Sequence, residues 1–240
     1  MFSLLVAVGL AHAVLCVCGQ TLLPITDYGA VAGMDAGREV TELNSKALAE
    51  ALFASQHGRG VAHVPAGLDF RVTNTTMDGL HGAALRVDGG LHMADEPTWW
   101  DTTTKSAMLL LTNTTDFALD GTGRVDGHGY IWWVRALAHV GETRPYVVLL
   151  HSGTGTRVGG NLSFVDGPGE HLRLVDQVTM RVSNVSVMVH LDGFRAAHRA
   201  AGTWDEVNGI PTVPLNTDGI DPSGRDIQGH CHPGLLHSKL

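Results

Sequence analysis

The chain has 240 residues, of which 44% are apolar, 17% charged and 6% aromatic, and its formal net charge is −8. That length is enough for one large domain with a buried core. The negative charge excludes a general nucleic-acid binder, and apolar residues spread along the whole chain exclude intrinsic disorder. The 30 glycines exceed the roughly 7% of average proteins and favour tight turns between short aliphatic strands.

Residues 1–19 are predicted to be a signal peptide. Residues 2–18 are mostly apolar and carry no acidic or basic side chain. The segment is shorter than the about 20 residues that a membrane span needs, and an uncleaved anchor is the alternative interpretation. A cleaved signal leaves residues 20–240 as one domain and predicts a secreted, extracellular protein with no membrane attachment after cleavage.

Four Asn-X-Ser/Thr sequons favour secretion, because composition alone predicts only one or two. The predicted glycosylation sites are Asn74, Asn113, Asn161 and Asn184. Of the 3 cysteines, Cys16 and Cys18 would leave with the signal, and Cys231 would remain alone in the mature chain. An unpaired thiol is unusual in a secreted domain, so its partner is expected outside this chain.

One short amphipathic helix is predicted near the start, over residues 41–54, which are rich in strong helix formers. Its apolar face is predicted to contain Leu43, Ala47, Leu48, Ala51 and Leu52. A solenoid needs its open end covered, so this helix is expected to act as an N-terminal cap.

Short segments of alternating apolar residues recur at a spacing of 22–23 residues. The matched pairs are Leu149 with Leu172, Val158 with Met180, Leu162 with Val185, and Phe164 with Val187. Three half-buried strands per repeat, separated by Gly, Asn and Asp, are typical of a parallel β-helix coil. A β-sandwich is the alternative, but it does not require the same three-strand pattern to superpose after each step.

Two features lie beside these coils. Trp132 and Trp133 are expected in a loop, where structural packing is favoured over stacking on sugar rings. Ile227 is expected to be the strand partner of Val178, with residues 191–215 as a polar insertion that lengthens this coil.

Residues 216–221, Asn-Thr-Asp-Gly-Ile-Asp, are the most informative stretch. Acid/base cleavage of a glycosidic bond needs one protonated carboxyl and one carboxylate on opposite sides of the bond. Asp218 and Asp221 are three residues apart, so in an extended chain they point to opposite faces and do not form such a pair. From the residues alone, Asx-type turn positions between strands are the favoured interpretation.

The same stretch resembles the NTDG-x-D segment of the polygalacturonases, the family 28 glycoside hydrolases. Further segments match that family in order: 25–30, 64–67, 125–133 and 144–145. The resemblance covers nearly all of residues 25–228. It implies an all-β, right-handed parallel β-helix and inverting hydrolysis of α-1,4-galacturonosyl linkages in pectin, with a pectic polysaccharide as partner and no cofactor.

The resemblance also implies roles for single residues. Asp218 matches the family's first catalytic aspartate, one of the carboxylates associated with the attacking water. Asn216, Thr217 and Gly219 would shape or support the substrate groove, and Asp221 would give structural support. A monomer is expected. The net charge does not attract a polyanion, so a pectin site needs a local basic patch.

Some family segments have no counterpart here. An Asp-Asp pair, a Gly-His-Gly and an Arg-x-Lys should follow within the next coils, yet the sequence stops at Leu240. No second carboxylate is predicted at the position of the general acid. The chain is therefore expected to be a C-terminally incomplete β-helix, and the alternative is a non-catalytic carbohydrate-binding β-helix or an inactive gene fragment. Metal binding by the adjacent His230, Cys231 and His232 is not favoured, so no metal site is expected.

Overall fold

The computed structural model describes residues 20–138, 142–202 and 217–230. The strands are β1 (Leu22–Pro24), β2 (Val61–Val64), β3 (Asp69–Val72), β4 (Thr75–Asp78), β5 (Ala84–Val87), β6 (Gly90–Met93), β7 (Ala107–Thr112), β8 (Ala118–Asp120), β9 (Arg124–Asp126), β10 (Tyr146–His151), β11 (Arg157–Val158), β12 (Leu162–Val165), β13 (Leu172–Ser183), β14 (Val185–Met188) and β15 (Ile220–His230). The α-helices are α1 (Arg38–Ser55), α2 (Tyr130–Ala138) and α3 (Leu191–Ala200), and short 3-10 helices lie at Ile25–Tyr28, Gln56–Gly58 and Pro97–Trp99. None of the helices in this part of the chain has the length and apolar character to span a membrane.

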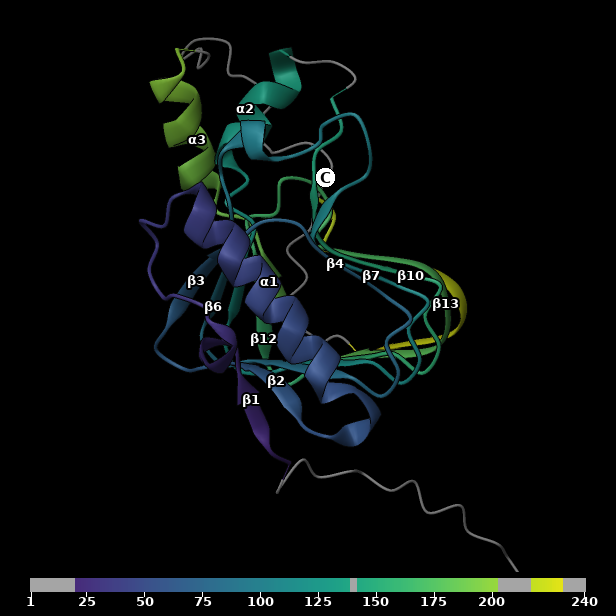
Figure 1. Cartoon of the computed structure of the whole chain (residues 1–240). Helices are drawn as coiled ribbons and strands as arrows, with labels where there is room; N and C mark the ends of the chain where they lie inside the picture. Colours follow the sequence, from purple (N-terminus) through teal and green to yellow (C-terminus); the bar gives the residue numbers. More distant parts are fainter. Residues whose placement is uncertain (1–19, 139–141, 203–216, 231–240) are drawn as a thin grey trace, which may run out of the picture.

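The strands stack in parallel into a coil with three faces. One sheet follows the order β1-β2-β5-β8-β11-β13-β10-β7-β4, and β15 pairs with β13 beside this path. The other sheet follows β14-β12-β9-β6-β3. Because the 12-residue β13 turns a corner within its length, it joins two faces into one sheet. Figure 1 shows β4, β7, β10 and β13 side by side on one face. The expected parallel β-helix is confirmed.

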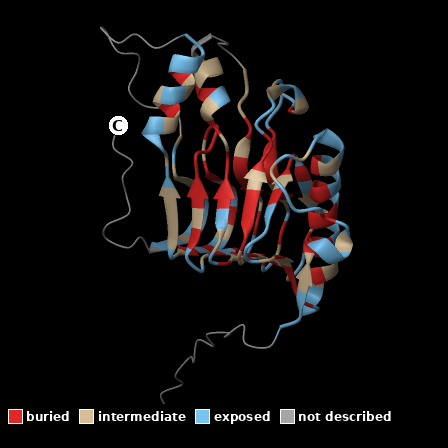
Figure 2. Cartoon of the chain, turned by 90° about the vertical axis from the view of Figure 1, so that its left-hand side faces the viewer, coloured by how far each residue is buried: buried red, intermediate tan, exposed pale blue. Residues whose placement is uncertain are grey.

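The predicted repeat is confirmed in the second sheet. Leu162 is paired with Val185 and Phe164 with Val187 in the parallel register of β12 and β14. Phe164 is fully buried. Figure 2 shows buried residues concentrated on the strands and exposed residues on the loops and helix surfaces. The coil is therefore filled by one continuous column of apolar side chains.

Three predicted strand pairs are wrong by one or two residues. The observed pairs are Val148 with Leu172, Val158 with Val182, and Met180 with Ile227. The four central residues of β10 are all buried. A strand without polar alternation does not reveal its register, since a one-residue slip keeps an apolar side chain at every position. An irregularity between Leu174 and Gln177 also shifts the register of β13 against β15.

The predicted capping helix is confirmed as α1, which runs over the N-terminal end of the coil and contacts β2, β3 and β4 (Figure 1). Its buried face includes Ala47, Leu48, Ala51 and Leu52. Leu43, however, is 41% exposed, so its placement on that face is wrong. Asn44 lies on the buried face instead, because its amide donates to the backbone carbonyls of Val31 and Arg71.

Residues other than glycine also lie at the corners of the coil, with backbones in the left-handed region. Asn113, Ser152 and Asp176 have φ values of 52°, 56° and 51°. They stack one coil above another, because the N–H of Asn113 donates to His151 and that of Ser152 to Val175. Asn and Asp tolerate the left-handed region because their short polar side chains bond locally.

Two helices extend the coil on its upper side in Figure 1. The loop expected around Trp132 and Trp133 is a helix, α2, and both rings are buried. Packing was therefore the correct interpretation of these rings. The insertion expected at 191–215 begins with α3, and the remainder after residue 202 lies outside the described residues. Phe194 of α3 packs on Trp133 with ring centroids 5.9 Å apart.

Candidate functional site

The predicted site residues lie at the start of β15. Asp218 is exposed, and Thr217 and Gly219 are partly buried. Asp221 lies in β15, whereas Asn216 falls outside the described residues. The structure therefore presents the Asp218 carboxylate to solvent at the point where the chain enters the sheet.

The backbone at Asp218 is held by a buried histidine. The Asp218 carbonyl oxygen accepts from the His171 backbone N–H at 3.0 Å and from His171 Nδ1 at 3.2 Å. His171 Nε2 accepts from the Gly167 N–H at 2.9 Å. The two ring nitrogens therefore have different roles, because Nδ1 donates and Nε2 accepts. The imidazole is the neutral Nδ1–H tautomer. This histidine positions the Asp218 turn.

Replacing His171 with glutamine should weaken the dependence of stability on pH. Burial lowers the pKa of His171 from its ordinary value of 6.5. The unfolded chain therefore binds a proton at His171 more readily than the folded chain does. The contribution of His171 to the free energy of unfolding is at its full value above pH ~6.5 and falls as the pH drops below that value. Between pH 7.5 and 5, the free energy of unfolding measured in urea should fall more for the wild type than for His171→Gln. Equal falls would contradict this expectation.

A second carboxyl group lies next to Asp218 on the neighbouring coil. Leu172 of β13 is the register partner of Ile220 of β15, so Glu170 and Asp218 both lie two residues before paired positions. Burial raises the pKa of Glu170, Arg173 opposes this effect and the nearby charge of Asp218 adds to it. Glu170 is therefore a candidate second carboxyl group that the sequence alone did not single out, and the expectation that no carboxylate takes the position of the general acid stays a prediction.

Arg173 connects the two coils. Its Nε lies 3.4 Å from Glu170 Oε2, and its Nη1 forms an ion pair with Asp221. Glu170 Oε2 is buried, and Arg173 is the cation that pairs with it. Asp221 is consequently an anchor for Arg173, and its supporting role in a substrate groove stays a prediction.

Two further cations act on the Glu170 carboxyl group. Lys105 and Arg144 both act electrostatically on Glu170, in the direction that favours its ionised form. Arg144 Nη1 donates to the Pro168 carbonyl at 2.7 Å, and burial lowers the pKa of Arg144. Together with Arg173, these side chains form a basic cluster of three cations, which lies among the three carboxyl groups of Glu170, Asp218 and Asp221.

A buried aspartate secures the adjoining elements. Asp166 accepts from the Tyr130 hydroxyl at 2.6 Å, from the His190 N–H at 2.7 Å and from His190 Nδ1 at 2.8 Å. Burial, followed by the Asp166 hydrogen bond, raises the pKa of Tyr130. The first turn of α2, the end of β12 and the residue before α3 are thereby tied together.

The four sequon asparagines are all exposed. Asn161 and Asn184 lie one coil apart, because the Asn161 N–H donates to the Asn184 carbonyl at 2.7 Å. Their glycosylation stays a prediction.

Sequence reasoning missed Glu170, His171 and Asp166. His171 and Asp218 are 47 residues apart in the chain, so only a correct coil register brings them together. The usable signal was the apolar pairing of Leu172 with Ile220, which extends back to these polar positions.

Stacked parallel strands on three faces, with a helix over one end, define a parallel β-helix of the pectin-lyase-like fold. One solved structure that the chain resembles is the crystal structure of endo-xylogalacturonan hydrolase from Aspergillus tubingensis, with a TM-score of 0.61 at 16% identity. The match covers 87% of this chain and 50% of that one, so the chain spans about half the length of this neighbour. No protein-family model and no curated protein matches the sequence.

Proposed function

We propose that the protein is a glycoside hydrolase that cleaves α-1,4-galacturonosyl or related linkages in an acidic pectic polysaccharide, with inversion at the anomeric carbon. The observation that carries this proposal is the placement of Glu170 and Asp218 at neighbouring positions of successive coils, within a basic cluster. The fold shared with an endo-xylogalacturonan hydrolase and the polygalacturonase-like segment around Asp218 support it.

The two carboxyl groups would have different roles, one as general acid and the other as general base. Glu170 donates a proton to the glycosidic oxygen as the bond from that oxygen to the anomeric carbon breaks. Asp218 accepts a proton from the water that attacks the same carbon from the opposite face. A raised pKa suits the donor because it keeps the carboxyl protonated to higher pH. The exposed Asp218 suits the water side because solvent reaches it.

The basic cluster would bind the polymer. Galacturonate units carry carboxylates, and guanidinium groups pair with carboxylates through charge-assisted hydrogen bonds. Arg173 is already engaged by Glu170 and Asp221, so the exposed Lys105 is the first candidate for a substrate carboxylate. A local basic patch remains the requirement that the overall negative charge imposes on a pectin site.

Incubation with polygalacturonate and with xylogalacturonan tests the proposal through the appearance of reducing ends. Asp218→Asn is expected to lower the rate by about 10²–10⁴-fold, because the variant cannot take the proton from water. Asp192→Asn is the matched control, since Asp192 in α3 has a side chain that is 99% exposed. Unchanged hydrolysis by Asp218→Asn would remove Asp218 from the mechanism.

The alternative is a non-catalytic carbohydrate-binding β-helix, which the engagement of Glu170 and Asp221 by Arg173 favours. It predicts retention of the polymer on the protein without any new reducing ends. In that case Lys105→Gln should weaken retention while Asp218→Asn leaves it unchanged. Whether the protein is a hydrolase or a carbohydrate-binding protein, we expect it to be secreted as a monomer and glycosylated at the exposed sequons.

A further inference from the structure

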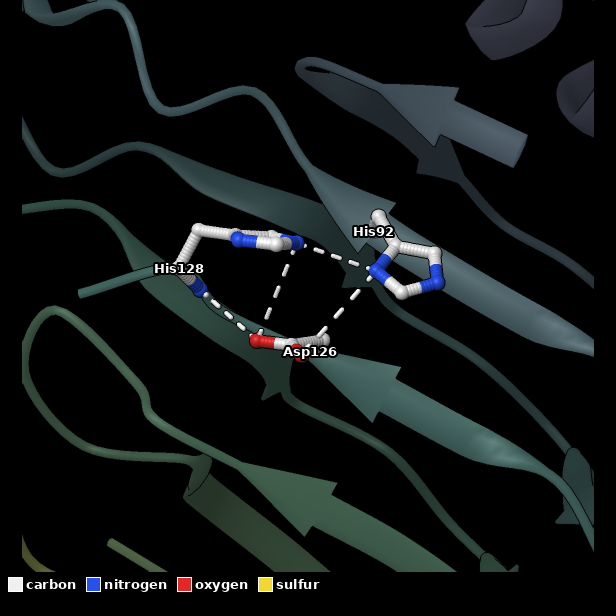
Figure 3. Close-up of side chains that lie close together, drawn as sticks. All are labelled: His92, Asp126 and His128. Atoms are coloured by element: carbon white, nitrogen blue, oxygen red, sulfur yellow. Dashed lines mark hydrogen bonds and ion pairs between the residues drawn. The ribbon is translucent and has the colours of Figure 1, made fainter. Parts of the chain in front are cut away.

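Three side chains with metal-binding atoms converge at the carboxyl ends of two neighbouring strands (Figure 3). His92 of β6 and Asp126 of β9 are register partners. His128 follows β9 with a φ of 46°, and its backbone N–H donates to Asp126 Oδ1 at 3.0 Å. This turn places the His128 ring beside His92 instead of continuing the strand.

The distances suit a single cation. His92 Nδ1 and His128 Nε2 are 3.0 Å apart. The Asp126 oxygens lie 4.0 Å from His92 Nδ1 and 3.9 Å from His128 Nε2. Metal–nitrogen bonds of about 2.0–2.1 Å place two ligand atoms about 3.3 Å apart in a tetrahedral site. Small ring movements are therefore enough to admit an ion between the three groups.

A further carboxylate orients the first histidine. Asp69 Oδ1 lies 3.1 Å from His92 Nε2. Donation of the Nε2 proton to Asp69 leaves the Nδ1 lone pair facing His128 and Asp126, and a carboxylate behind a histidine is the usual arrangement at zinc sites. Gly90 makes room for this pair, because a Cβ there would collide with both Asp69 Oδ1 and His92 Nε2.

The charges around the cluster also allow a cation. Asp126 has a 4% exposed side chain and forms an ion pair with Arg124. Arg71, the next guanidinium group, is paired with Asp95 and lies over Trp99 at 5.3 Å. Asp69, Asp95 and Asp126 thus outnumber the two arginines, and Arg124 can stay on one Asp126 oxygen while the other binds the ion.

We propose that His92, Asp126 and His128 bind a divalent transition-metal ion, with Asp69 as the positioning residue for His92. Two imidazoles and one carboxylate are a ligand set suited to Zn²⁺, Co²⁺ or Fe²⁺, with water completing the coordination. The sequence did not predict this site, since the three ligands come from two strands of different coils and match no metal motif. The proposal is independent of the hydrolase activity.

Titration of the untagged, EDTA-treated full chain with Co²⁺ tests it, followed by displacement with Zn²⁺. The wild type is expected to develop the visible absorption of bound Co²⁺ and to lose it when Zn²⁺ is added. Asp69→Asn should weaken binding about 10–100-fold, as loss of an orienting carboxylate does. His128→Gln should weaken it by at least about 100-fold, because a direct ligand is lost.

His81→Gln is the matched control, because His81 is an exposed histidine stacked on another histidine. Thermal melting without metal shows that each variant is folded. Zn²⁺ should raise the Tm of the wild type and of His81→Gln but not that of His128→Gln. Equal Co²⁺ affinity of the wild type and His128→Gln, or a wild type without Co²⁺ absorption, would overturn the proposal.

Discussion

Replacing Glu170 with glutamine is expected to lower kcat on polygalacturonate by about 10²–10⁴-fold, the usual contribution of a general acid. Glutamine keeps the size and shape of the side chain, but its amide has no acidic proton to transfer. Burial raises the pKa of Glu170, and Asp218 adds to that effect against the influence of Arg173. The alkaline limb of the wild-type pH–rate profile should therefore report Glu170.

The pH profile separates this role from a structural one. In Glu170→Gln the alkaline limb should disappear, whereas a purely structural defect would lower the rate without changing the shape of the profile. Arg173→Gln should move the limb to higher pH, because Arg173 lowers the pKa of Glu170. Glu50→Gln is the control, since Glu50 lies on α1 and pairs only loosely with Lys46 at 3.7 Å. An unaltered rate in Glu170→Gln would remove it as the proton donor.

Replacing Phe164 with alanine is expected to lower the free energy of unfolding by about 3–5 kcal/mol. Phe164 is fully buried in β12, between Val125 of β9 and Val187 of β14 in the register. A cavity there removes contacts from two coil interfaces at once, because each coil is stabilised by its neighbours. Urea denaturation followed by far-ultraviolet circular dichroism measures the loss.

Phe53→Ala provides the comparison. Phe53 lies on α1 and is 65% exposed, so its loss should change stability by less than about 0.5 kcal/mol. Comparable destabilisation by the two variants would contradict a coil interior organised around Phe164.

How far the fold could be predicted differs between elements. The β12–β14 pairing was predictable because alternation in Leu162–Val165 marks which side chains face inward. The register at β10 was not, because its apolar run has no alternation. Helix α2 was missed since a Trp-rich segment after a glycine turn carries no cap signal, and its burial depends on α3, which is distant in sequence.

The residues of the candidate site also differ in how far they could be predicted. Asp218 was predicted through the resemblance of its Asn-Thr-Asp-Gly segment to a family motif, which is a short contiguous signal, and its catalytic role stays a proposal. Glu170 was not, because its neighbourhood in the sequence, Gly-Pro-Gly-Glu-His, contains no catalytic pattern. Only its position one coil before Asp218 marks it, together with the burial that raises its pKa.

The amino-acid sequence by itself determined that this chain coils in parallel strands, because the alternation of apolar residues and the turn residues between them are local properties that repeat. It also placed one carboxylate, Asp218, at a strand entry. The tertiary structure decided which polar residues meet. Stacking of the coils sets Glu170 beside Asp218 and His92 beside Asp126 and His128, since the parallel register joins positions that are far apart in the chain.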